Sequence, residues 1–259
     1  MPLDNREYRR RLGFTNQNEL KKFFKATNIV VVNWTRVERC NERLKEIFRA
    51  IDTTVHSDIR VDNIEEFCLK VDETYQILKD NNILPRMNNY GRTPDDVYYN
   101  WMRGYLVCEY FSKALSVIFD VEQEAIATVG DDKLTDIDTF SQSPTADLEI
   151  TLPDRTIRLE VQSGYTGIND IKAHKVVEAK RLLAETGVYS YVVHFDLFNG
   201  KAALIDISSI DNASIHWERR AQMEDQKVFS IPENSFSWDL TDAPQAYANI
   251  LYQEENETA

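Results

Sequence analysis

Apolar residues recur with helical spacing along the first third of the chain. Within residues 34–51 they fall at Trp34, Val37, Leu44, Ile47 and Phe48. Residues 61–78 repeat the spacing at Ile64, Phe67, Cys68, Val71 and Ile77. Side chains three or four positions apart share one face of a helix. The pattern therefore predicts helices across residues 17–80.

The start of a further helix is predicted from its capping chemistry. It follows a stretch rich in Asn, Pro and Gly, which indicates a connection. Thr93 can cap the first turn, and Pro94 suits the first helical position. Asp95 and Asp96 stabilise the positive end of the helix dipole. We expect this helix to run to about Phe119.

The second half of the chain alternates between apolar and polar residues. A short strand is expected in residues 124–129, and two alternating runs flank a Pro153-Asp154 turn. Next we expect a helix from Asn169 to Thr186, with Asn169 as its N-cap and Gly187 ending it.

Two β-rich runs then meet at Asn199-Gly200, and a late strand is expected within residues 226–232. The order helix, strand, hairpin, helix, strand, strand predicts an α/β fold with a mixed sheet flanked by helices. An N-terminal helical region precedes it.

Composition and motifs exclude several classes of protein. The chain has 259 residues, 42% of them hydrophobic, and no apolar run approaches a membrane span. The N-terminus lacks the apolar segment of a secretory signal. Cys40, Cys68 and Cys108 lie far apart without CxxC spacing, which favours reduced thiols in a cytoplasmic protein over a zinc site. The sequence has no phosphate-binding glycine loop, and its four histidines are dispersed.

Charge is distributed unevenly along the sequence. Residues 1–50 contain 12 Lys and Arg against 6 Asp and Glu, a net charge of +6, whereas the whole chain carries −13. Two interpretations of this basic segment stay open: a solvated helix face, or an arm that neutralises phosphates.

The predicted hairpin gathers acidic residues on one face. The Pro153-Asp154 turn sets a register in which Glu149 lies opposite Arg158, and Asp147 lies opposite Glu160. Like charges directly across a strand pair are destabilising. A Mg²⁺ ion between Asp147 and Glu160 would turn this repulsion into ligation. The alternative is an acidic, solvent-facing hairpin without a metal.

These residues resemble the PD-(D/E)XK nuclease superfamily, which includes type II restriction endonucleases, Holliday-junction resolvases and repair nucleases. The resemblance consists of Pro144, Asp147 and the Glu160-Val161-Gln162 triplet, within an element order that covers residues 95 to about 208. It implies a restriction-endonuclease-like fold. It also implies that Mg²⁺ is held by Asp147, Glu160 and the backbone carbonyl of Val161.

The triplet departs from the family pattern at its last position. Gln162 stands where the family usually has a lysine, and glutamine can hydrogen-bond a water but supplies no positive charge. Lys172 or Lys175 is a candidate replacement, and solvated helix lysines are the alternative. Glu109 is a candidate for the further acid that many members carry on the preceding helix; the alternative is an ion pair with Lys113.

The resemblance implies a Mg²⁺-dependent, sequence-specific endonuclease that cuts double-stranded DNA, a type II restriction enzyme expected to act as a homodimer. The rivals are a repair or junction nuclease with the same core, and a non-catalytic DNA- or protein-binding module. We expect a helical region at 1–90, a nuclease core at 91–245 and an acidic tail at 246–259. The expected DNA contacts are Arg9, Arg10, Arg11, Lys21, Lys22, Lys172 and Lys175.

Overall fold

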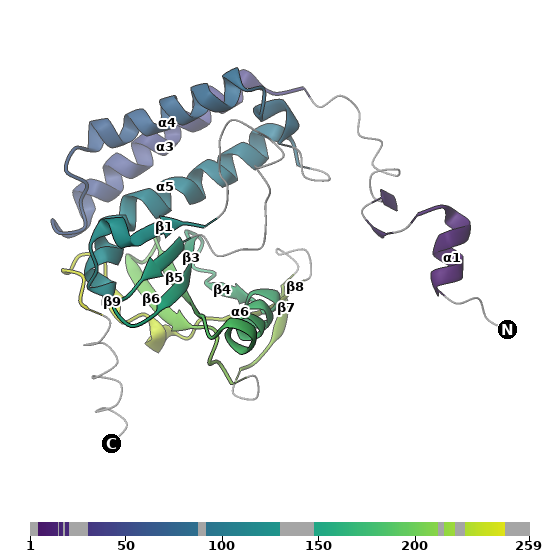
Figure 1. The fold of residues 1–259 in the computed structure, drawn as a ribbon. Coiled ribbons are helices and arrows are strands. Elements are labelled where there is room, and N and C mark those ends of the chain that lie inside the picture. The colour runs from purple at the N-terminus through teal and green to yellow at the C-terminus, as the bar shows by residue number, and fades with distance from the viewer. Residues whose placement is uncertain are drawn as a thin grey trace.

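The computed structural model describes residues 5–14, 16–17, 19–20, 31–87, 92–129, 148–211, 215–220 and 226–246. Within this part of the chain, helices dominate the first half and strands the second (Figure 1). None of the described helices is both long and apolar enough to cross a membrane.

The helical half confirms the predicted spacing and the predicted Thr93 cap. Its helices are α1 (Asn5–Leu12), α3 (Trp34–Thr54), α4 (Ile64–Asp80) and α5 (Pro94–Phe119), with a short 3-10 turn, η1, at Leu84–Arg86. The side chains of Asn33, Asn63 and Thr93 accept hydrogen bonds from backbone N–H groups in the first turns of α3, α4 and α5.

A six-stranded sheet forms the centre of the second half. In spatial order it comprises β1 (Ile126–Thr128), β2 (Leu148–Thr151), β3 (Thr156–Gly164), β5 (Tyr189–Asp196), β6 (Lys201–Asp206) and β9 (Trp238–Asp239). Only β3 and β5 pair in parallel; the other neighbours are antiparallel. The predicted mixed sheet is therefore confirmed.

The β2–β3 hairpin has the predicted register over its described residues. Glu149 lies opposite Arg158, and the ladder runs from the Thr151–Thr156 pair at the turn to the Leu148–Leu159 pair. The turn closes where the N–H of Leu152 donates to the carbonyl of Arg155. The expected opposition of Asp147 and Glu160 lies outside the described part of the chain, because Asp147 is not among its residues.

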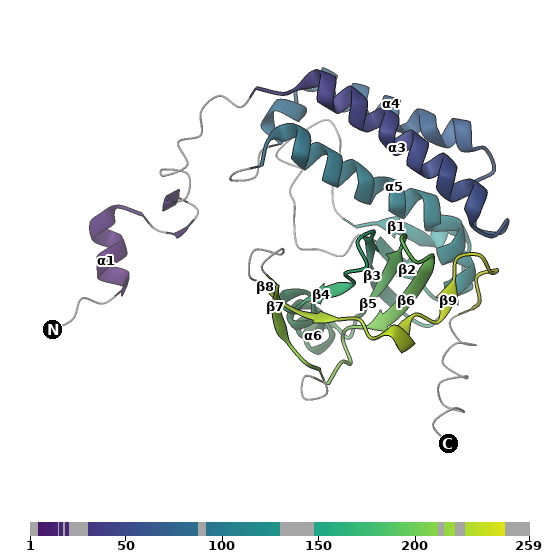
Figure 2. The ribbon, with the colours of Figure 1, turned by 180° about the vertical axis from the view of Figure 1, so that it is seen from behind.

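Helices cover both faces of the sheet (Figures 1 and 2). On one face, α5 packs over Leu159 and Phe195, and Phe111 stacks on the Phe195 ring with centroids 3.9 Å apart. On the other face, α6 (Ala173–Thr186) packs over Val192 in a smaller apolar cluster. Since β-strand side chains alternate in direction, even-numbered residues of β3 and β5 face α6 and odd-numbered ones face α5.

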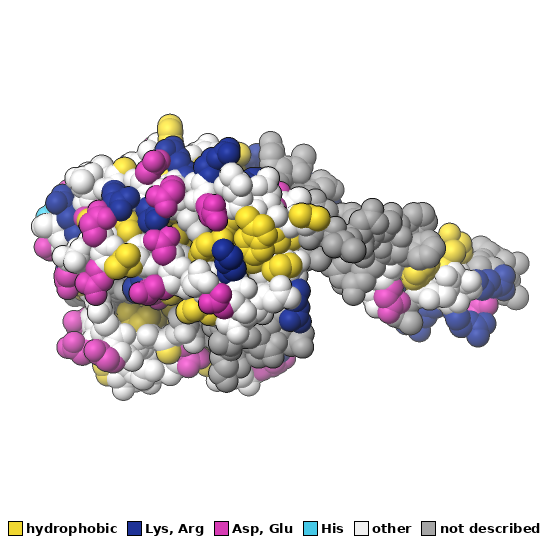
Figure 3. All heavy atoms as spheres, turned by 90° about the horizontal axis from the view of Figure 1, so that it is seen from above, with side chains coloured by type: hydrophobic (Ala, Val, Ile, Leu, Met, Phe, Trp, Pro, Cys, Tyr) yellow, Lys and Arg dark blue, Asp and Glu magenta, His cyan; other side chains and the backbone are white. Residues whose placement is uncertain are grey.

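Helices α3 and α4 belong to the larger of the two cores. Phe48 and Phe67 contact Tyr110 of α5, with ring centroids 5.5 Å apart in both pairs. Figure 3 looks onto the side formed by these helices and shows acidic and basic side chains interspersed over it. Helices α3 and α4 of the predicted N-terminal region thus share a core with the sheet, whereas α1 buries none of its residues.

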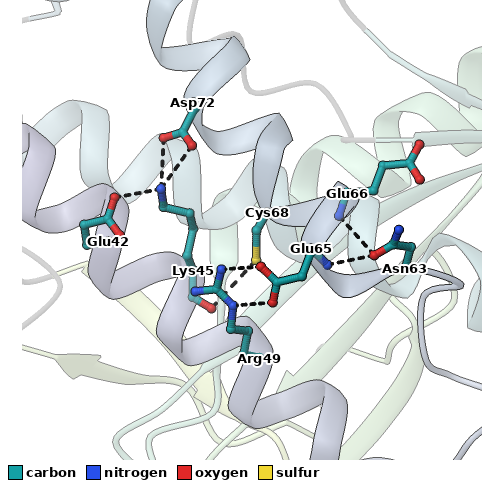
Figure 4. Close-up of polar contacts among 8 residues, drawn as sticks. All are labelled: Glu42, Lys45, Arg49, Asn63, Glu65, Glu66, Cys68 and Asp72. Atoms are coloured by element: carbon teal, nitrogen blue, oxygen red, sulfur yellow. Dashed lines mark hydrogen bonds and ion pairs between the residues drawn. The ribbon is translucent and has the colours of Figure 1, made fainter.

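Ion pairs join α3 to α4 at their surface (Figure 4). Arg49 donates two hydrogen bonds to the Glu65 carboxylate, at 2.7 and 2.6 Å, and Lys45 donates to both oxygens of Asp72. Exposed pairs of this kind contribute little to stability, because water screens their charges. The apolar contacts beneath them therefore dominate the packing.

A second, three-stranded sheet was not predicted. It consists of β4 (Asp170–Lys172), β8 (Gln226–Ser230) and β7 (Glu218–Arg220), in that order. The helix expected from Asn169 is correspondingly wrong at its start. Residues 170–172 extend to pair with β8, and α6 begins at Ala173. Its end is as predicted, at Gly187 with φ +73°.

Candidate active site

Three polar side chains from the central strands face α6. Glu160 and Gln162 lie two residues apart on β3, and His194 of β5 is in register with Gln162. Their apolar neighbours Val161 and Val193 belong to the opposite core. The period of two along a strand therefore separates the polar site from the main core without any break in the sheet.

Glu160 is paired with a lysine of the next helix. The Nζ atom of Lys175 donates to Oε2 of Glu160 at 2.6 Å, and the two side chains are only 18% and 13% exposed. Lysine and glutamate are rarely so shielded from water unless they are paired. The structure therefore places a positive charge beside the glutamate of the Glu160-Val161-Gln162 triplet, two strand positions from Gln162.

More positive groups surround the start of α6. Lys172 occupies the N-cap position, and its side chain makes no capping hydrogen bond. Burial lowers the pKa of His174, and the charges of Lys172 and Lys175 lower it further, against the opposing effect of Glu160. The uncapped N–H groups of a first turn carry a partial positive charge. This corner of the site therefore favours an anion.

A chain of polar contacts runs from Gln162 into the protein. Nδ1 of His194 lies 3.4 Å from Oε1 of Gln162, and its Nε2 lies 2.8 Å from Oδ1 of Asn169. Nδ2 of Asn169 donates to Oδ2 of Asp196 at 2.7 Å. His194 is 4% exposed and Asp196 2% exposed. Four side chains from two strands and a loop thus form one continuous path, of which His194 and Asp196 are fully buried.

Asp196, the last residue of β5, ends this path. Its Oδ1 accepts the backbone N–H groups of Phe198 and Asn199, and its Oδ2 also accepts from Nδ2 of Asn199. Burial alone would raise the pKa of Asp196, but these hydrogen bonds and the one from Asn169 outweigh it and lower the pKa. Asp196 is therefore an ionised carboxylate that can only accept hydrogen bonds.

Burial lowers the pKa of His194 to about 4, although the negative charges of Asp196 and Asp170 act in the opposite direction. His194 is therefore neutral near pH 7. His194 is a buried histidine of the central strand β5.

Gly164 makes room for the central contact of the path. A Cβ atom at this position would lie 2.6 Å from Oδ1 of Asn169 and 3.0 Å from Nε2 of His194. Both separations are too short for ordinary contact. Glycine is thus needed here because of the close approach of two side chains, since its backbone does not adopt a positive φ.

The structure does not bring Glu109 to this site. Glu109 lies on α5 and accepts a hydrogen bond from Lys70 of α4 at 2.6 Å, on the far side of the sheet from Glu160. The alternative partner, Lys113, instead donates to Asp62 and to the backbone of Arg60. Glu109 is thus a helix-bridging residue, and its expected role as a further acid of the site is corrected.

The described residues contain no cluster of three or more His, Cys, Asp or Glu side chains arranged to hold a metal ion. The predicted ligand pair falls outside this search, because Asp147 is not in the described part. Cys40, Cys68 and Cys108 form no disulfide, and of the three only Cys68 is fully buried.

The predicted DNA-contacting residues are dispersed. Arg10 and Arg11 both pair with Glu7 on the surface of α1, and Arg9 is exposed there. Lys175 is committed to Glu160, so it belongs to the site itself and not to an outer phosphate-binding surface. Lys172 stands at the start of α6. Lys21 and Lys22 are outside the described residues.

An apolar pocket of about 430 Å³ opens at the end of the sheet where β3 and β5 finish. Phe48 and Val107 of the helices form part of its wall, and Tyr165 and Phe198 come from the loops that follow the two strands. The guanidinium of Arg103 lies 4.8 Å from the centre of the Tyr165 ring. Phe198 is 72% exposed, so an aromatic edge borders the pocket.

Sequence reasoning missed Asn169 and Asp196 as members of the site. Asn169 has the signature of a helix cap and Asp196 that of a turn residue before Asn199-Gly200. The available signal was positional, because His194 and Asp196 alternate on one face of a strand in which Val192, Val193 and Phe195 are apolar. A polar residue on such a buried strand requires a partner.

No protein-family model matches this sequence, and no curated protein was found to match it. Among solved structures, the chain is similar to a Holliday junction resolvase from the archaeal hyperthermophile Archaeoglobus fulgidus. The match has a TM-score of 0.31 and 17% sequence identity, and it covers 49% of this chain and 88% of the resolvase chain. The function proposed below rests on this chain's own residues.

Proposed function

We propose that this protein is a Mg²⁺-dependent DNA endonuclease whose active site lies between β3 and the start of α6. The observation that carries the proposal is the 2.6 Å contact between Lys175 and Glu160. The resemblance to PD-(D/E)XK nucleases implies a lysine charge beside the second acid, where this sequence has Gln162. Lys175 supplies that charge from the helix, which supports an intact site rather than a degenerate one.

With Asp147 added, the oxygen ligands at this site suit Mg²⁺. Mg²⁺ prefers carboxylate and carbonyl oxygens, and the described residues offer the carboxylate of Glu160 and the backbone carbonyl of Val161. Continuing the β2–β3 register by one position beyond Leu148–Leu159 pairs Asp147 with Glu160. Asp147, Glu160 and Val161 are therefore the proposed ligands, with the position of Asp147 part of the proposal.

A bound Mg²⁺ would polarise the scissile phosphate and lower the pKa of a coordinated water. Lys175 places an ammonium group where a phosphate oxygen gains negative charge. The start of α6, with Lys172 at its N-cap, supplies N–H donors for a neighbouring phosphate. Gln162 hydrogen-bonds the attacking water.

With regard to substrate, we propose site-specific cleavage of double-stranded DNA by a homodimer, as in type II restriction enzymes. The basic N-terminal segment supports it: α1 carries three consecutive arginines in its last turn, and all three are exposed. Such a segment would add phosphate contacts to those at the start of α6. A nuclease for branched or damaged DNA uses the same chemistry on a different substrate.

The test is cleavage of plasmid DNA and of a branched DNA junction, each with Mg²⁺ and with EDTA. Discrete plasmid bands support the site-specific enzyme, whereas cutting of the junction alone supports the rival nuclease. Glu160→Gln and Lys175→Gln should each lower the rate at least about a hundredfold, as expected when a catalytic charge is lost.

Lys70→Gln is the matched control, because Lys70 makes an ion pair of the same 2.6 Å length with Glu109 in the helical layer. It should cleave at the wild-type rate. If Lys175→Gln also cuts at that rate, Lys175 has no part in catalysis. Absence of cleavage of either substrate by the wild-type protein would leave a binding module as the remaining interpretation.

A further inference from the structure

Each hydrogen bond of the polar path behind Gln162 has a defined donor and a defined acceptor. The assignment starts from Asp196. An ionised carboxylate has no proton to donate. Both of its oxygens accept hydrogen bonds, and Oδ2 lies 2.7 Å from a terminal atom of the Asn169 amide. That atom must be the nitrogen, since an oxygen at this distance would face another acceptor.

The fixed orientation of the Asn169 amide determines which ring nitrogen of His194 carries the proton. With its nitrogen held by Asp196, the amide turns its oxygen, Oδ1, toward Nε2 of His194 at 2.8 Å. Only a protonated Nε2 can donate to that oxygen. Gly164 leaves the two groups the space to meet. Asp196 therefore selects the Nε2–H form of the histidine ring through Asn169.

The ring then determines which end of the Gln162 amide it contacts. A neutral imidazole carries one proton, and burial keeps His194 neutral by lowering its pKa to about 4. With Nε2 protonated, Nδ1 holds a lone pair and needs a donor. Of the two ends of the Gln162 amide, only the NH₂ group can donate. A half-turn of the amide brings its nitrogen to the position 3.4 Å from Nδ1.

We propose that Asp196, Asn169 and His194 form a relay that orients the Gln162 amide, so that its nitrogen faces His194 and its carbonyl oxygen faces outward on the Glu160 side of the sheet. Gln162 then presents an acceptor to a water molecule beside Glu160. This use in catalysis rests on the proposed nuclease function, whereas the orientation itself does not.

The relay explains why Gln162 and Lys175 occur together. A lysine at position 162 would offer only donors, which satisfies the lone pair of Nδ1 but leaves no acceptor for the water. Glutamine serves both needs, and the positive charge comes from Lys175 on α6. The two roles of a single family lysine are thus divided between two side chains.

The test uses ¹⁵N NMR of the histidine ring, which distinguishes the two neutral tautomers without any measurement of activity. In the wild-type protein near pH 7, His194 should be in the Nε2–H form, with Nδ1 accepting a hydrogen bond. Asp196→Asn removes the fixed acceptor, so Asn169 can adopt either orientation and a mixture of tautomers should appear. An Nδ1–H form in the wild-type protein would overturn the relay.

Asp206→Asn is the matched control. Asp206 ends β6 as Asp196 ends β5, and it accepts hydrogen bonds from the backbone N–H groups of Ser208 and Ser209. It is not part of the relay. Asp206→Asn should therefore leave the His194 tautomer unchanged, which separates a loss of loop hydrogen bonds from a loss of direction in the relay.

Kinetics then tests the link to catalysis. Asp196→Asn should lower kcat about tenfold, the value of one oriented hydrogen bond, and change KM little. An unchanged kcat together with mixed tautomers would refute the positioning role of the relay. If the wild-type protein cuts no DNA, the nuclease proposal fails, while the NMR result still decides whether the relay exists.

Discussion

His194 should make the stability of this protein sensitive to mild acid. The perturbation is a change from about pH 7 to about pH 4, compared between the wild-type protein and His194→Gln, which has no titrating ring. His194 is 4% exposed, and its burial lowers its pKa from 6.5 to about 4. Protonating the buried ring is therefore unfavourable.

The sign and size of the effect follow from linkage. Below about pH 6.5 the unfolded chain binds a proton at His194 that the folded protein does not bind until about pH 4. The stability that depends on the neutral ring is therefore complete above the unfolded-state pKa of 6.5. It is lost as the pH falls toward the folded-state pKa of about 4. At about 1.36 kcal/mol per pKa unit, the loss amounts to about 3 kcal/mol.

The assay is urea unfolding of both proteins at a series of pH values, followed by circular dichroism. Carboxylates titrate in both proteins, so the difference between their unfolding free energies isolates His194. This difference should shrink by about 3 kcal/mol from neutral to acidic pH. A difference that stays constant with pH would refute the description of His194 as a neutral, buried ring.

Three further predictions concern packing and caps. Phe111→Ala removes a fully buried ring stacked on Phe195 and should cost about 3–5 kcal/mol in unfolding free energy, measured by urea unfolding. Tyr110→Phe loses the hydrogen bond from the Tyr110 hydroxyl to Asp52 at 2.8 Å and should cost about 1 kcal/mol in the same assay, whereas an unchanged midpoint would show that the bond contributes nothing. Gly187→Ala forces a side chain into a backbone with φ +73° and should lower the thermal midpoint by the equivalent of about 1 kcal/mol; because no atom lies within 4 Å of the added Cβ, a much larger loss would contradict a purely backbone effect.

Local signals in the sequence predicted most of the secondary structure. Thr93-Pro94 marks the start of α5, Gly187 marks the end of α6, and the Pro153-Asp154 turn set the Glu149–Arg158 register. Each of these features is decided by residues only a few positions apart. Capping, turn and alternation rules act over such distances, so one sequence is enough to reveal them.

The errors concern contacts between segments far apart in the chain. Asn169 is followed by β4 and not by a helix because residues 170–172 pair with β8, about sixty positions further on. Glu109 was expected in the site because it precedes the hairpin, but its partner is Lys70 of another helix. Local propensity does not include such partners. The same holds for Lys175, where the sequence indicated a candidate and the helix position decided the contact.

Six described side chains of the polar site come from one short piece of chain. The strand–helix–strand unit formed by β3, α6 and β5, residues 156–196, supplies Glu160, Gln162, Asn169, Lys175, His194 and Asp196. The helices before it and the strands after it contribute none of these groups. A single continuous segment therefore carries these six side chains, and the sequences of the surrounding layers can change without removing any of them.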